Sequence, residues 1–438
     1  MKPSAYVKSA AEAPRKMSQQ RFQAPRGTSD VLPDEQVYWR LLETRVEDVA
    51  ARFGYERINT PAFENANLFV RSVGEATDIV EKETYTFEDR GGDLVSLRPE
   101  GTAPVCRAYL QHGMHNLPQP VRLFYMGDFF RYDRPQAGRY RQFHQFGVEV
   151  IGEADASVDS EVIDLAWLVL ESLGVKDVTL LLNSIGDTEC RPRYIDELQS
   201  YYRSRADELV HDDCIRRLET NPLRLLDCKN GACQPLIDAA PGSVDYLCDN
   251  CSQHWHSLLS DLDALGRSYK TDKRLVRGLD YYSRTVFEIV PPKDGRQSTL
   301  VAGGRYDGLI EILGGRPTPG IGFAMGIERV LAAIRENEEP ITQDVRNKVM
   351  VAHMGDEAKS AGMLLCSELR AGGVAAVLGP AGRSLKSQLR YASSIGSTHA
   401  VIIGDRELES GSFVLRNLAD SEQRVVPRDG LVEAMSPH

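Results

Sequence analysis

Two β-rich segments joined by a short loop constrain the fold of this chain most strongly. Residues 121–131 and 141–151 are both rich in Phe, Tyr and Val, and the loop between them contains Pro, Gly and Arg. Segments of this composition, separated by turn-forming residues, are typical of antiparallel strands. The sequence therefore predicts a long β-hairpin within a larger sheet.

Further strands are predicted before and after this hairpin. The stretch 55–65 contains Pro61, and proline cannot donate to a central ladder, so this stretch is predicted to be an edge or interface strand. Symmetric pairing of two chains across that edge is possible. Residues 274–290, 298–302 and 318–324 are predicted to be strands, and the last is expected to run into a helix near Met325. Together these segments predict one mostly antiparallel sheet, preceded by an amphipathic helix at 34–53.

The order of the segments predicts an α+β protein with two main domains. Residues 1–20 are predicted to be a flexible tail, although an organelle transit peptide is an alternative. Residues 21–335 carry the sheet, interrupted by a helical insertion at 186–270, and the polar stretch 336–345 with Pro340 is expected to be a linker. Strands at 348–353, 374–378 and 399–404 then alternate with helices at 356–370 and 384–395, so residues 346–438 should form a small α/β domain.

Composition narrows the functional classes. With 42% hydrophobic and 26% charged residues the chain has the usage of a soluble folded protein, and its net charge of −11 argues against a generally basic nucleic-acid coat. No apolar run is long enough to span a bilayer and no signal peptide is evident, so a cytoplasmic location is expected. In that setting the eight cysteines should be reduced.

Polar residues on the predicted hairpin suggest a ligand site. Gln145 and Glu149 share a strand face, and Gly147 between them is expected to leave that face open. Arg131 ends the partner strand, so a guanidinium and a carboxylate should converge; a cross-strand ion pair on a solvated sheet is the alternative. The loop residues Arg134, Arg139 and Arg141 favour a polyanionic ligand.

The glycine-rich stretch 320–329 offers a second part of such a site. Gly320, Gly322 and Ala324 place no bulk on one strand face, where a flat aromatic ring could lie, and Arg329 follows on the next helix. The spacing is not the dinucleotide fingerprint, and the chain has no P-loop. Close packing of strand on helix is the alternative explanation of the glycines.

Residues 274–288 form a third part. Arg277 precedes Gly278, and Tyr281 and Tyr282 follow. Buried tyrosines are commonly core residues with one satisfied hydroxyl. Together with the Gly-rich stretch 302–308, however, they favour a polar, aromatic pocket over a plain core.

These stretches resemble class II aminoacyl-tRNA synthetases, and within them the histidyl-tRNA synthetase family. Residues 55–64, 130–152 and 320–331 are similar to motifs 1, 2 and 3 of the class. The sequences LVRGLDYYSRTVFE and AGGRYDGL look like the two histidine-specific signatures, and APRGTSDVLPDE and RPEGTAPVCRAYL also match the family. The resemblance covers essentially everything after residue 20 and implies a class II catalytic domain followed by an anticodon-binding domain.

The resemblance implies a role for each matching residue. Glu100, Thr102 and Gln145 would hold the histidine α-amino group, and Glu149, Tyr282 and Tyr281 the imidazole. The catalytic arginines would be Arg131, on the ATP α-phosphate, and Arg277, which stands where other class II enzymes use an additional metal ion. Arg139, Arg329 and Gly322 would complete the ATP site. ATP with Mg²⁺, L-histidine and tRNA(His) are the implied ligands, and a homodimer the implied assembly.

Two further groups remain open at this point. Arg383, Lys386 and Arg390 should share one helix face, which is either solvated or, in an anticodon-binding domain, in contact with RNA phosphates. Cys228, Cys233, Cys248 and Cys251, with His254 and His256 close behind, have a spacing that could hold zinc. Reduced structural thiols are the preferred interpretation, so no metal site is predicted.

One alternative function comes from a different class. Non-catalytic relatives of the family act as regulatory subunits of ATP phosphoribosyltransferase and resemble the catalytic domain alone. Here a domain follows residue 346, and Arg277, Tyr281 and Tyr282 are present. The sequence therefore favours a synthetase.

Overall fold

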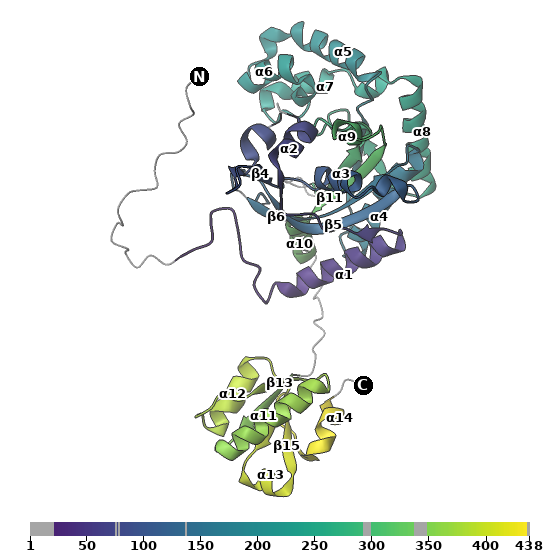
Figure 1. Cartoon of the computed structure of the whole chain (residues 1–438). Coiled ribbons are helices and arrows are strands. Elements are labelled where there is room, and N and C mark those ends of the chain that lie inside the picture. The colour runs from purple at the N-terminus through teal and green to yellow at the C-terminus, as the bar shows by residue number, and fades with distance from the viewer. Residues whose placement is uncertain are drawn as a thin grey trace, which may run out of the picture. The chain divides into compact units, whose positions relative to one another are not determined.

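The computed structural model describes residues 22–74, 77, 79–135, 138–291, 299–336 and 348–435. The predicted tail, 1–20, lies outside the described residues, as do residues 337–345 of the predicted linker. The chain divides into two compact units, Met1–Pro340 and Ile341–His438, and each is described by itself (Figure 1).

An eight-stranded sheet forms the centre of the first unit, in the order β1-β5-β6-β11-β10-β9-β7-β8. Its strands are β1 (Glu56–Arg57), β5 (Val121–Phe130), β6 (Gln142–Ile151), β7 (Thr179–Ser184), β8 (Tyr269–Thr271), β9 (Ser283–Val290), β10 (Val301–Arg305) and β11 (Gly320–Gly326). The pairs β1–β5 and β7–β8 at the two margins are parallel, and the five pairs between them are antiparallel. The predicted mostly antiparallel sheet is confirmed.

The predicted hairpin is confirmed as β5 and β6, paired from Val121 opposite Ile151 to Phe130 opposite Gln142. Because successive side chains on a strand point to opposite faces, Gln145 and Glu149 lie on one face of β6 and Val148 on the other. Helix α4 (Ala156–Ser172) contacts β10 and β11, and α10 (Ile327–Glu336) contacts β6. The predicted N-terminal helix is confirmed as α1 (Gln36–Arg52), which packs against α4 and α10.

Three strand predictions need correction. The stretch 274–290 is a strand only from Ser283, because residues 274–282 follow an irregular path that still buries Leu275, Tyr281 and Tyr282. These buried apolar and aromatic residues have the composition of a strand but do not pair with one, which is why the sequence predicted a longer strand. The strand predicted at 298–302 is β10, which extends to Arg305, and the strand predicted at 318–324 is β11, which ends at Gly326.

The stretch predicted as one edge strand, 55–65, is divided between two sheets. Its first part, β1, lies at the margin of the main sheet, whereas β2 (Phe63–Asn65) belongs to a three-stranded sheet with β3 (Thr86–Glu88) and β4 (Leu94–Leu97). Between them, the carbonyl of Thr60 accepts a hydrogen bond of 2.9 Å from the Arg98 guanidinium. The backbone on either side of Pro61 therefore bonds to Arg98: the Thr60 carbonyl to its side chain, and the Ala62 carbonyl to its backbone N–H at 3.0 Å.

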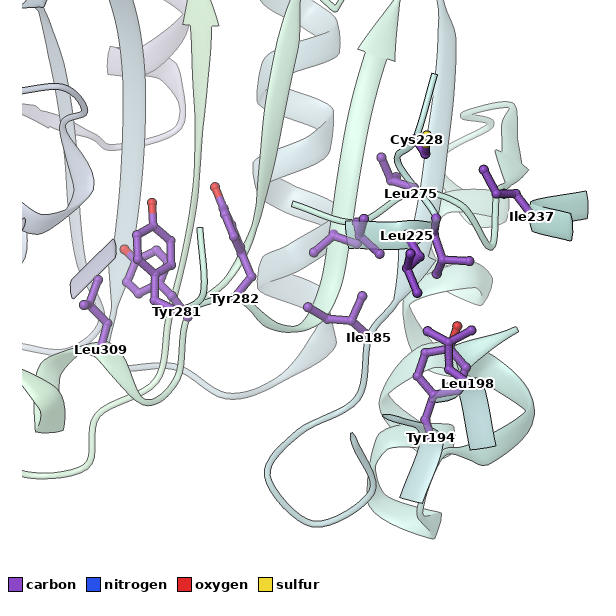
Figure 2. Packing of buried hydrophobic residues seen from close by; sticks show 14 of the residues in the cluster. Ile185, Tyr194, Leu198, Leu225, Cys228, Ile237, Leu275, Tyr281, Tyr282 and Leu309 are labelled. Carbon is purple, nitrogen blue, oxygen red and sulfur yellow. The ribbon is translucent and has the colours of Figure 1, made fainter. Parts of the chain in front are cut away.

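A helical region separates β7 from β8, as predicted for residues 186–270. It contains α5 (Arg191–Arg203), α6 (Asp212–Thr220), α7 (Gln234–Ala239) and α8 (Asp249–Ala264), with 3₁₀ turns η4 (Pro222–Leu225) and η5 (Gly231–Cys233) between them. Buried side chains of α5, α6, α7 and the turns between them join those of the sheet in one cluster. Figure 2 shows this cluster, with Tyr281, Tyr282 and Leu309 on one side and Leu225, Cys228 and Leu275 on the other. The helical region is thus packed onto the wall that carries Tyr281 and Tyr282.

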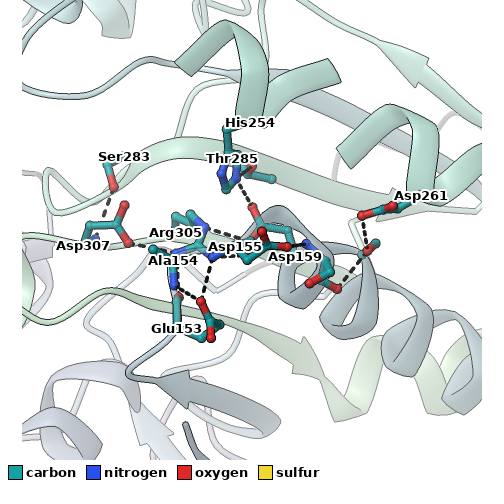
Figure 3. Close-up of polar contacts among 12 residues, drawn as sticks. Glu153, Ala154, Asp155, Asp159, His254, Asp261, Ser283, Thr285, Arg305 and Asp307 are labelled. Carbon is teal, nitrogen blue, oxygen red and sulfur yellow. Dashed lines mark hydrogen bonds and ion pairs between the residues drawn. The ribbon is translucent and has the colours of Figure 1, made fainter. Parts of the chain in front are cut away.

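A buried polar network ties helices to the sheet (Figure 3). The Nε of Arg305 on β10 donates to Asp159 on α4 at 2.7 Å, and the other oxygen of Asp159 lies 2.8 Å from Nε2 of His254 on α8. Arg305 and Asp159 are both 0% exposed. A buried charge must be paired and hydrogen-bonded to be tolerated, so this network fixes how α4 and α8 pack on the sheet.

The second unit is a small α/β domain, as predicted. Its five-stranded sheet has the order β13-β12-β14-β15-β16, with β12 (Lys348–His353), β13 (Ala375–Leu378), β14 (His399–Ile403), β15 (Ser412–Asn417) and β16 (Gln423–Pro427). Helices α11 (Asp356–Ala371) and α12 (Leu385–Ser394) connect the parallel strands, which confirms the predicted alternation; β15 and β16 extend the sheet by antiparallel pairing. None of the helices described in either unit is long and apolar enough to span a membrane.

Candidate active site

A cavity of about 460 Å³ opens between the hairpin, β11 and the segment that precedes β9. Nine of the eleven residues predicted for the site line it: Glu100, Thr102, Arg131, Arg139, Gln145, Arg277, Tyr281, Tyr282 and Arg329. Glu149 and Gly322 are not among the described lining residues. Segments separated by more than a hundred positions in the sequence therefore meet at one place.

The N-terminus of helix α3 (Thr102–Gln111) positions the acidic end of the cavity. The Glu100 carboxylate accepts hydrogen bonds from the backbone N–H groups of Thr102 at 2.7 Å and Ala103 at 3.0 Å. Free N–H groups and the helix dipole favour a negative charge there. Burial raises the pKa of Glu100, while these two N–H donors act in the opposite direction. A carboxylate fixed in this way suits an ammonium ligand.

Glu149 lies directly behind this end of the cavity and is 0% exposed. Its Oε1 accepts a hydrogen bond from the Thr102 hydroxyl at 2.8 Å, and its Oε2 accepts one from the Tyr306 hydroxyl at 2.7 Å. Burial raises the pKa of Glu149 to about 8, although both hydroxyl donors lower it. Near neutral pH the group can therefore exchange a proton or share one with a ligand.

Three glycines predicted to leave room for a ligand leave room for protein side chains instead. A Cβ at position 147 would lie 2.3 Å from the ring of Tyr125, so that ring covers the face expected to be open. A Cβ on Gly322 would lie 2.1 Å from Oε2 of Glu149, and one on Gly320 would lie 2.3 Å from the ring of Tyr306. The predicted bare face of β11 is thus occupied by protein, and of its three residues Ala324 lines the cavity.

Aromatic side chains form one wall. The ring centroids of Tyr281 and Tyr282 lie 4.7 Å apart, and those of Tyr281 and Tyr306 lie 6.0 Å apart. Figure 2 shows Tyr281 and Tyr282 side by side, with their hydroxyls pointing the same way. Sequence reasoning singled out the stretch that contains Tyr306 but did not assign that residue a role. Its position two residues after a pair of strand glycines is the signal that could have found it.

Four of the predicted arginines surround the rest of the cavity, and each has a protein partner. Arg131 donates to the Pro99 carbonyl at 2.8 Å, Arg139 pairs with Asp133 at 3.0 Å, and Arg329 donates to the Thr299 carbonyl at 2.9 Å. Arg277 forms an ion pair with Glu288 on β9. The pKa of Arg329 is lowered, first by burial and then by the neighbouring Arg139 and Arg131, so this part of the cavity is strongly positive.

Two polar atoms of the cavity have no protein partner. Among the described residues, no hydrogen bond reaches Oε1 of Gln145 or Nε of Arg277, and both atoms are buried. Leaving a buried polar atom unsatisfied costs about 1–3 kcal/mol, and such atoms in native proteins commonly mark a ligand or water position. The cavity therefore offers an acceptor at Gln145 and a donor at Arg277 to a ligand.

The remaining predicted groups are arranged differently from the prediction. Arg383 precedes the N-cap of α12, so Lys386 and Arg390 alone share the helix face; all three are exposed. The four cysteines predicted as one group belong to two groups: Cys228 and Cys233 lie with His211 and Cys214, and Cys248 and Cys251 with Asp187 and Cys190. The two predicted histidines join neither group, because His254 bonds to Asp159 and His256 to Ser252.

Comparisons with known proteins agree with this arrangement. The model of a family described as Histidyl-tRNA synthetase matches residues 27–330, and that of an Anticodon binding domain matches residues 348–437. A Histidine--tRNA ligase of Dehalococcoides mccartyi is 53% identical over 411 residues, 94% of this chain and 98% of that protein. One of Desulfitobacterium hafniense is 46% identical over 414 residues, 94% of this chain and 97% of that protein.

A solved structure is similar over nearly the whole chain. Apo histidyl-tRNA synthetase of S. aureus matches with a TM-score of 0.79 and 37% identity, covering 95% of this chain and 100% of that one. A Bacillus halodurans structure described as an ATP phosphoribosyltransferase regulatory subunit/histidyl-tRNA synthetase matches with a TM-score of 0.63 at 23% identity over 87% of this chain and 98% of that one. That second likeness shows a shared fold.

Proposed function

The chain belongs to the histidyl-tRNA synthetase family, with its class II fold, and on this premise we propose how its cavity performs the reaction. It is a histidine--tRNA ligase, which joins L-histidine to tRNA(His). The proposed reaction has two steps. ATP and histidine form histidyl-adenylate and pyrophosphate, and the histidyl group then passes to the hydroxyl of the 3′-terminal ribose of the tRNA with release of AMP.

One observation carries this proposal. A single cavity joins a buried carboxylate end, with Glu100 and Thr102, to a cationic end that contains Arg131, Arg277 and Arg329. An amino acid presents an ammonium group and a carboxylate, and ATP presents a chain of phosphates. The two substrates would therefore meet between the two ends, with the histidine carboxylate directed toward the α-phosphate.

The histidine end would distinguish histidine from other amino acids. Glu100, Thr102 and the unpartnered Oε1 of Gln145 would bind the α-amino group. Glu149 would accept a hydrogen bond from the imidazole N–H beside Tyr281 and Tyr282, in addition to those from its hydroxyl donors. A site built from buried polar groups rejects ligands that lack the matching group by about 10⁴-fold or more, so selection of histidine needs no editing step.

The arginines would act on the charge that develops at phosphorus. The attacking histidine oxygen forms a bond to the α-phosphorus of ATP while the bond to the bridging oxygen breaks and releases pyrophosphate. Arg131 and Arg277 would hold the α-phosphate; among the described residues, the Nε of Arg277 has no hydrogen-bond partner. Arg139 and Arg329 would hold the remaining phosphates and the nucleotide. Fixed cations that bind the transition state more tightly than the ground state provide the rate enhancement.

Mg²⁺ is the proposed metal of this step, and it would neutralise the departing pyrophosphate when bound with ATP. The described acids of the cavity fit this role, since Glu288 lies at its wall beside Arg277 and accepts a hydrogen bond of 2.9 Å from Thr299. Glu288 would thus offer a carboxylate oxygen at the phosphate end. Gly322, which was predicted for the ATP site, would instead serve the histidine end, because it leaves the space in which Glu149 sits.

The second unit would bind the anticodon region of the tRNA. We assign residues 21–335 to the catalytic domain with its insertion at 186–270, 336–345 to a linker and 346–438 to the anticodon-binding domain. The exposed side chains of Lys386 and Arg390, on one face of α12, and of Arg383, just before the helix, would contact phosphates.

A homodimer in the cytoplasm is the proposed assembly and location. The margin strand β1 and the adjacent three-stranded sheet would form the interface, because that sheet exposes large apolar side chains: Phe63 is 57%, Phe87 49% and Leu94 52% exposed. Apolar side chains clustered on a sheet surface are typical of protein interfaces.

Histidine-dependent exchange of labelled pyrophosphate into ATP, measured without tRNA, tests the proposed activation step. Exchange with histidine and with none of the other amino acids is expected. Exchange with no amino acid would contradict the proposal and favour the alternative of a regulatory subunit of ATP phosphoribosyltransferase. That alternative is not favoured by the anticodon-binding match at 348–437.

A further inference from the structure

Two groups of metal-ligating side chains lie in the helical region between β7 and β8, outside the cavity. The first, group A, consists of His211, Cys214, Cys228 and Cys233, and the second, group B, of Asp187, Cys190, Cys248 and Cys251. Within each group the four potential ligand atoms all lie within 4.8 Å of one another. The six cysteines are free thiols, and five of them are buried.

The distances in group A match the edges of a zinc tetrahedron. Sγ of Cys214 lies 3.8 Å from Sγ of Cys233, and Nδ1 of His211 lies 3.4 Å from Sγ of Cys214 and 3.5 Å from Sγ of Cys228. With Zn–S of about 2.3 Å and Zn–N of about 2.0 Å, a tetrahedron has S–S edges of about 3.8 Å and S–N edges of about 3.5 Å. The side chains thus surround a space of the size that the ion needs.

Group B has the same spacing with an oxygen in place of the nitrogen. Oδ1 of Asp187 lies 3.5 Å from Sγ of Cys190, about the S–O edge expected around zinc. The local backbone accommodates the sulfur, because Gly186 has φ +67° and a Cβ there would lie 2.6 Å from Sγ of Cys190. The second oxygen of Asp187 lies 3.5 Å from the Arg284 guanidinium, which would orient the carboxylate.

Packing alone does not explain the two groups. Buried cysteines can serve as small apolar side chains, but apolar packing gives no reason for an imidazole in group A and a carboxylate in group B to point at three sulfurs. Each group draws its ligands from separated segments, as a structural metal site does. Thiolates are soft ligands, which favour zinc over magnesium or calcium.

We propose that group A and group B each bind one structural zinc ion, so that the chain carries two. Each site would have four protein ligands and no open position, which is the arrangement of a structural and not a catalytic zinc. Group A would connect the start of α6 to the segment between η4 and η5 and to the end of η5. This pairing differs from the order of the cysteines in the sequence, where Cys233 is followed directly by Cys248.

The ion of group B would hold the insertion against the wall of the cavity. Cys190 immediately precedes α5 and Cys248 immediately precedes α8, so the site joins the starts of two helices to Asp187 after β7. From the same place Arg191 donates to the Tyr282 carbonyl at 2.6 Å. Zinc at group B would therefore fix the backbone that carries Tyr282.

Metal analysis of the full-length chain, purified with reductant and passed through metal-free buffer, tests this proposal. Two zinc ions per chain are expected. The double substitution Cys214→Ser/Cys233→Ser should leave one, and Cys190→Ser/Cys251→Ser should also leave one. Cys366→Ser, at a buried free cysteine of the second unit, is the matched control and should leave two.

A measurement on the unsubstituted chain covers the case in which these variants fail to fold. Titration with a thiol-binding mercurial, with released zinc followed by a chelating dye, should release two zinc ions as the six thiols react. Wild-type protein that contains no zinc and binds none in competition with a weak chelator would overturn the proposal. So would iron in place of zinc, or a single zinc that either pair of substitutions removes.

Discussion

The hydroxyl of Tyr306 donates a hydrogen bond of 2.7 Å to Oε2 of Glu149, and both residues are buried directly behind the histidine end of the cavity. This bond fixes one oxygen of a carboxyl group that has no arginine or lysine among its described hydrogen-bond partners. The other oxygen, Oε1, accepts its hydrogen bond from Thr102, and it is this oxygen that would bond to an entering ligand.

Substitution of Tyr306 by Phe should weaken the binding of histidine. The change leaves a buried acceptor on Glu149 unsatisfied, at a cost of about 1–3 kcal/mol, which corresponds to a rise of roughly 5- to 150-fold in KM for histidine. Pyrophosphate exchange at varied histidine concentrations measures it. Tyr194→Phe, which removes a hydroxyl bonded to the Pro241 carbonyl in the insertion, is the control and should leave KM unchanged. Equal KM values for the two variants would remove Tyr306 from the site.

The stability of the first unit should depend on pH through Glu149. Burial raises the pKa of this group from 4.5 to about 8, so the folded chain binds the proton more tightly than the unfolded chain. The contribution of Glu149 to stability is therefore complete below about pH 4.5 and is lost as pH rises through about 8. Gln cannot ionise, so the Glu149→Gln variant does not lose stability in this way. The free energy of unfolding of the variant minus that of wild type should therefore rise between pH 5 and pH 8, by on the order of a few kcal/mol.

Urea unfolding of both proteins at several pH values measures that difference. Subtracting the wild-type free energy of unfolding from that of the variant removes the contribution of every ionisable group that the two proteins share. Glu197→Gln, at an exposed position, controls for the loss of one carboxyl from the chain. A difference between Glu149→Gln and wild type that stays constant from pH 5 to pH 8 would contradict the assigned pKa shift.

Arg277→Ala should slow adenylate formation by about 10²- to 10³-fold in kcat, the usual effect of losing one fixed donor from a site of developing charge. Removal of Arg277 also leaves Glu288 without its ion-pair partner. Arg277→Lys separates the two effects, because it keeps a cation beside Glu288 but lacks the Nε donor that faces the cavity. Single-turnover formation of histidyl-adenylate is the measurement, and a wild-type rate in Arg277→Ala would exclude Arg277 from the mechanism.

Arg305→Met should destabilise the first unit without a change in KM for histidine. Asp159 would lose its ion-pair partner while remaining buried, at a cost of about 3–5 kcal/mol. Chemical unfolding followed by tryptophan fluorescence measures this loss. Arg203→Ala, which breaks an exposed ion pair with Glu219, should leave the unfolding midpoint nearly unchanged. A midpoint for Arg305→Met equal to that of wild type would show that the network of Figure 3 does not stabilise the fold.

The sequence predicted those parts of the fold and the site that depend on local periodicity. The strand-forming composition of two segments and the loop between them were sufficient to predict the hairpin, and the alternation of side chains along a strand placed Gln145 and Glu149 on one face. It could not show that the ring of Tyr125, on the neighbouring strand, fills the space over Gly147. Whether a glycine makes room for a ligand or for another side chain depends on packing between segments, which periodicity does not contain.

The same limit explains the cysteines. Spacing along the chain grouped Cys228 and Cys233 with Cys248 and Cys251, because a short loop between two pairs is the usual pattern of a zinc site. In the structure α7 and a following 3₁₀ turn separate the two pairs, and each pair finds partners from earlier segments. Asp187 and His211 carry no spacing signal toward those cysteines, so sequence alone gave no means to include them.

The exposed side chains of Lys386 and Arg390 on α12 lead to a prediction about the binding of tRNA that leaves histidine activation unchanged. Lys386→Ala/Arg390→Ala should raise KM for tRNA(His) by about tenfold, since each phosphate contact contributes a salt-dependent part of the binding free energy. Histidine-dependent pyrophosphate exchange in the absence of tRNA should stay at the wild-type rate, because neither residue lies in the catalytic unit. Aminoacylation at varied tRNA and salt concentrations measures the change, and Lys359→Ala, at a half-buried lysine on α11 of the same unit, is the control. If the double variant and the control have the same KM for tRNA and the same salt dependence, this helix face is solvated and the RNA contacts of the domain lie elsewhere.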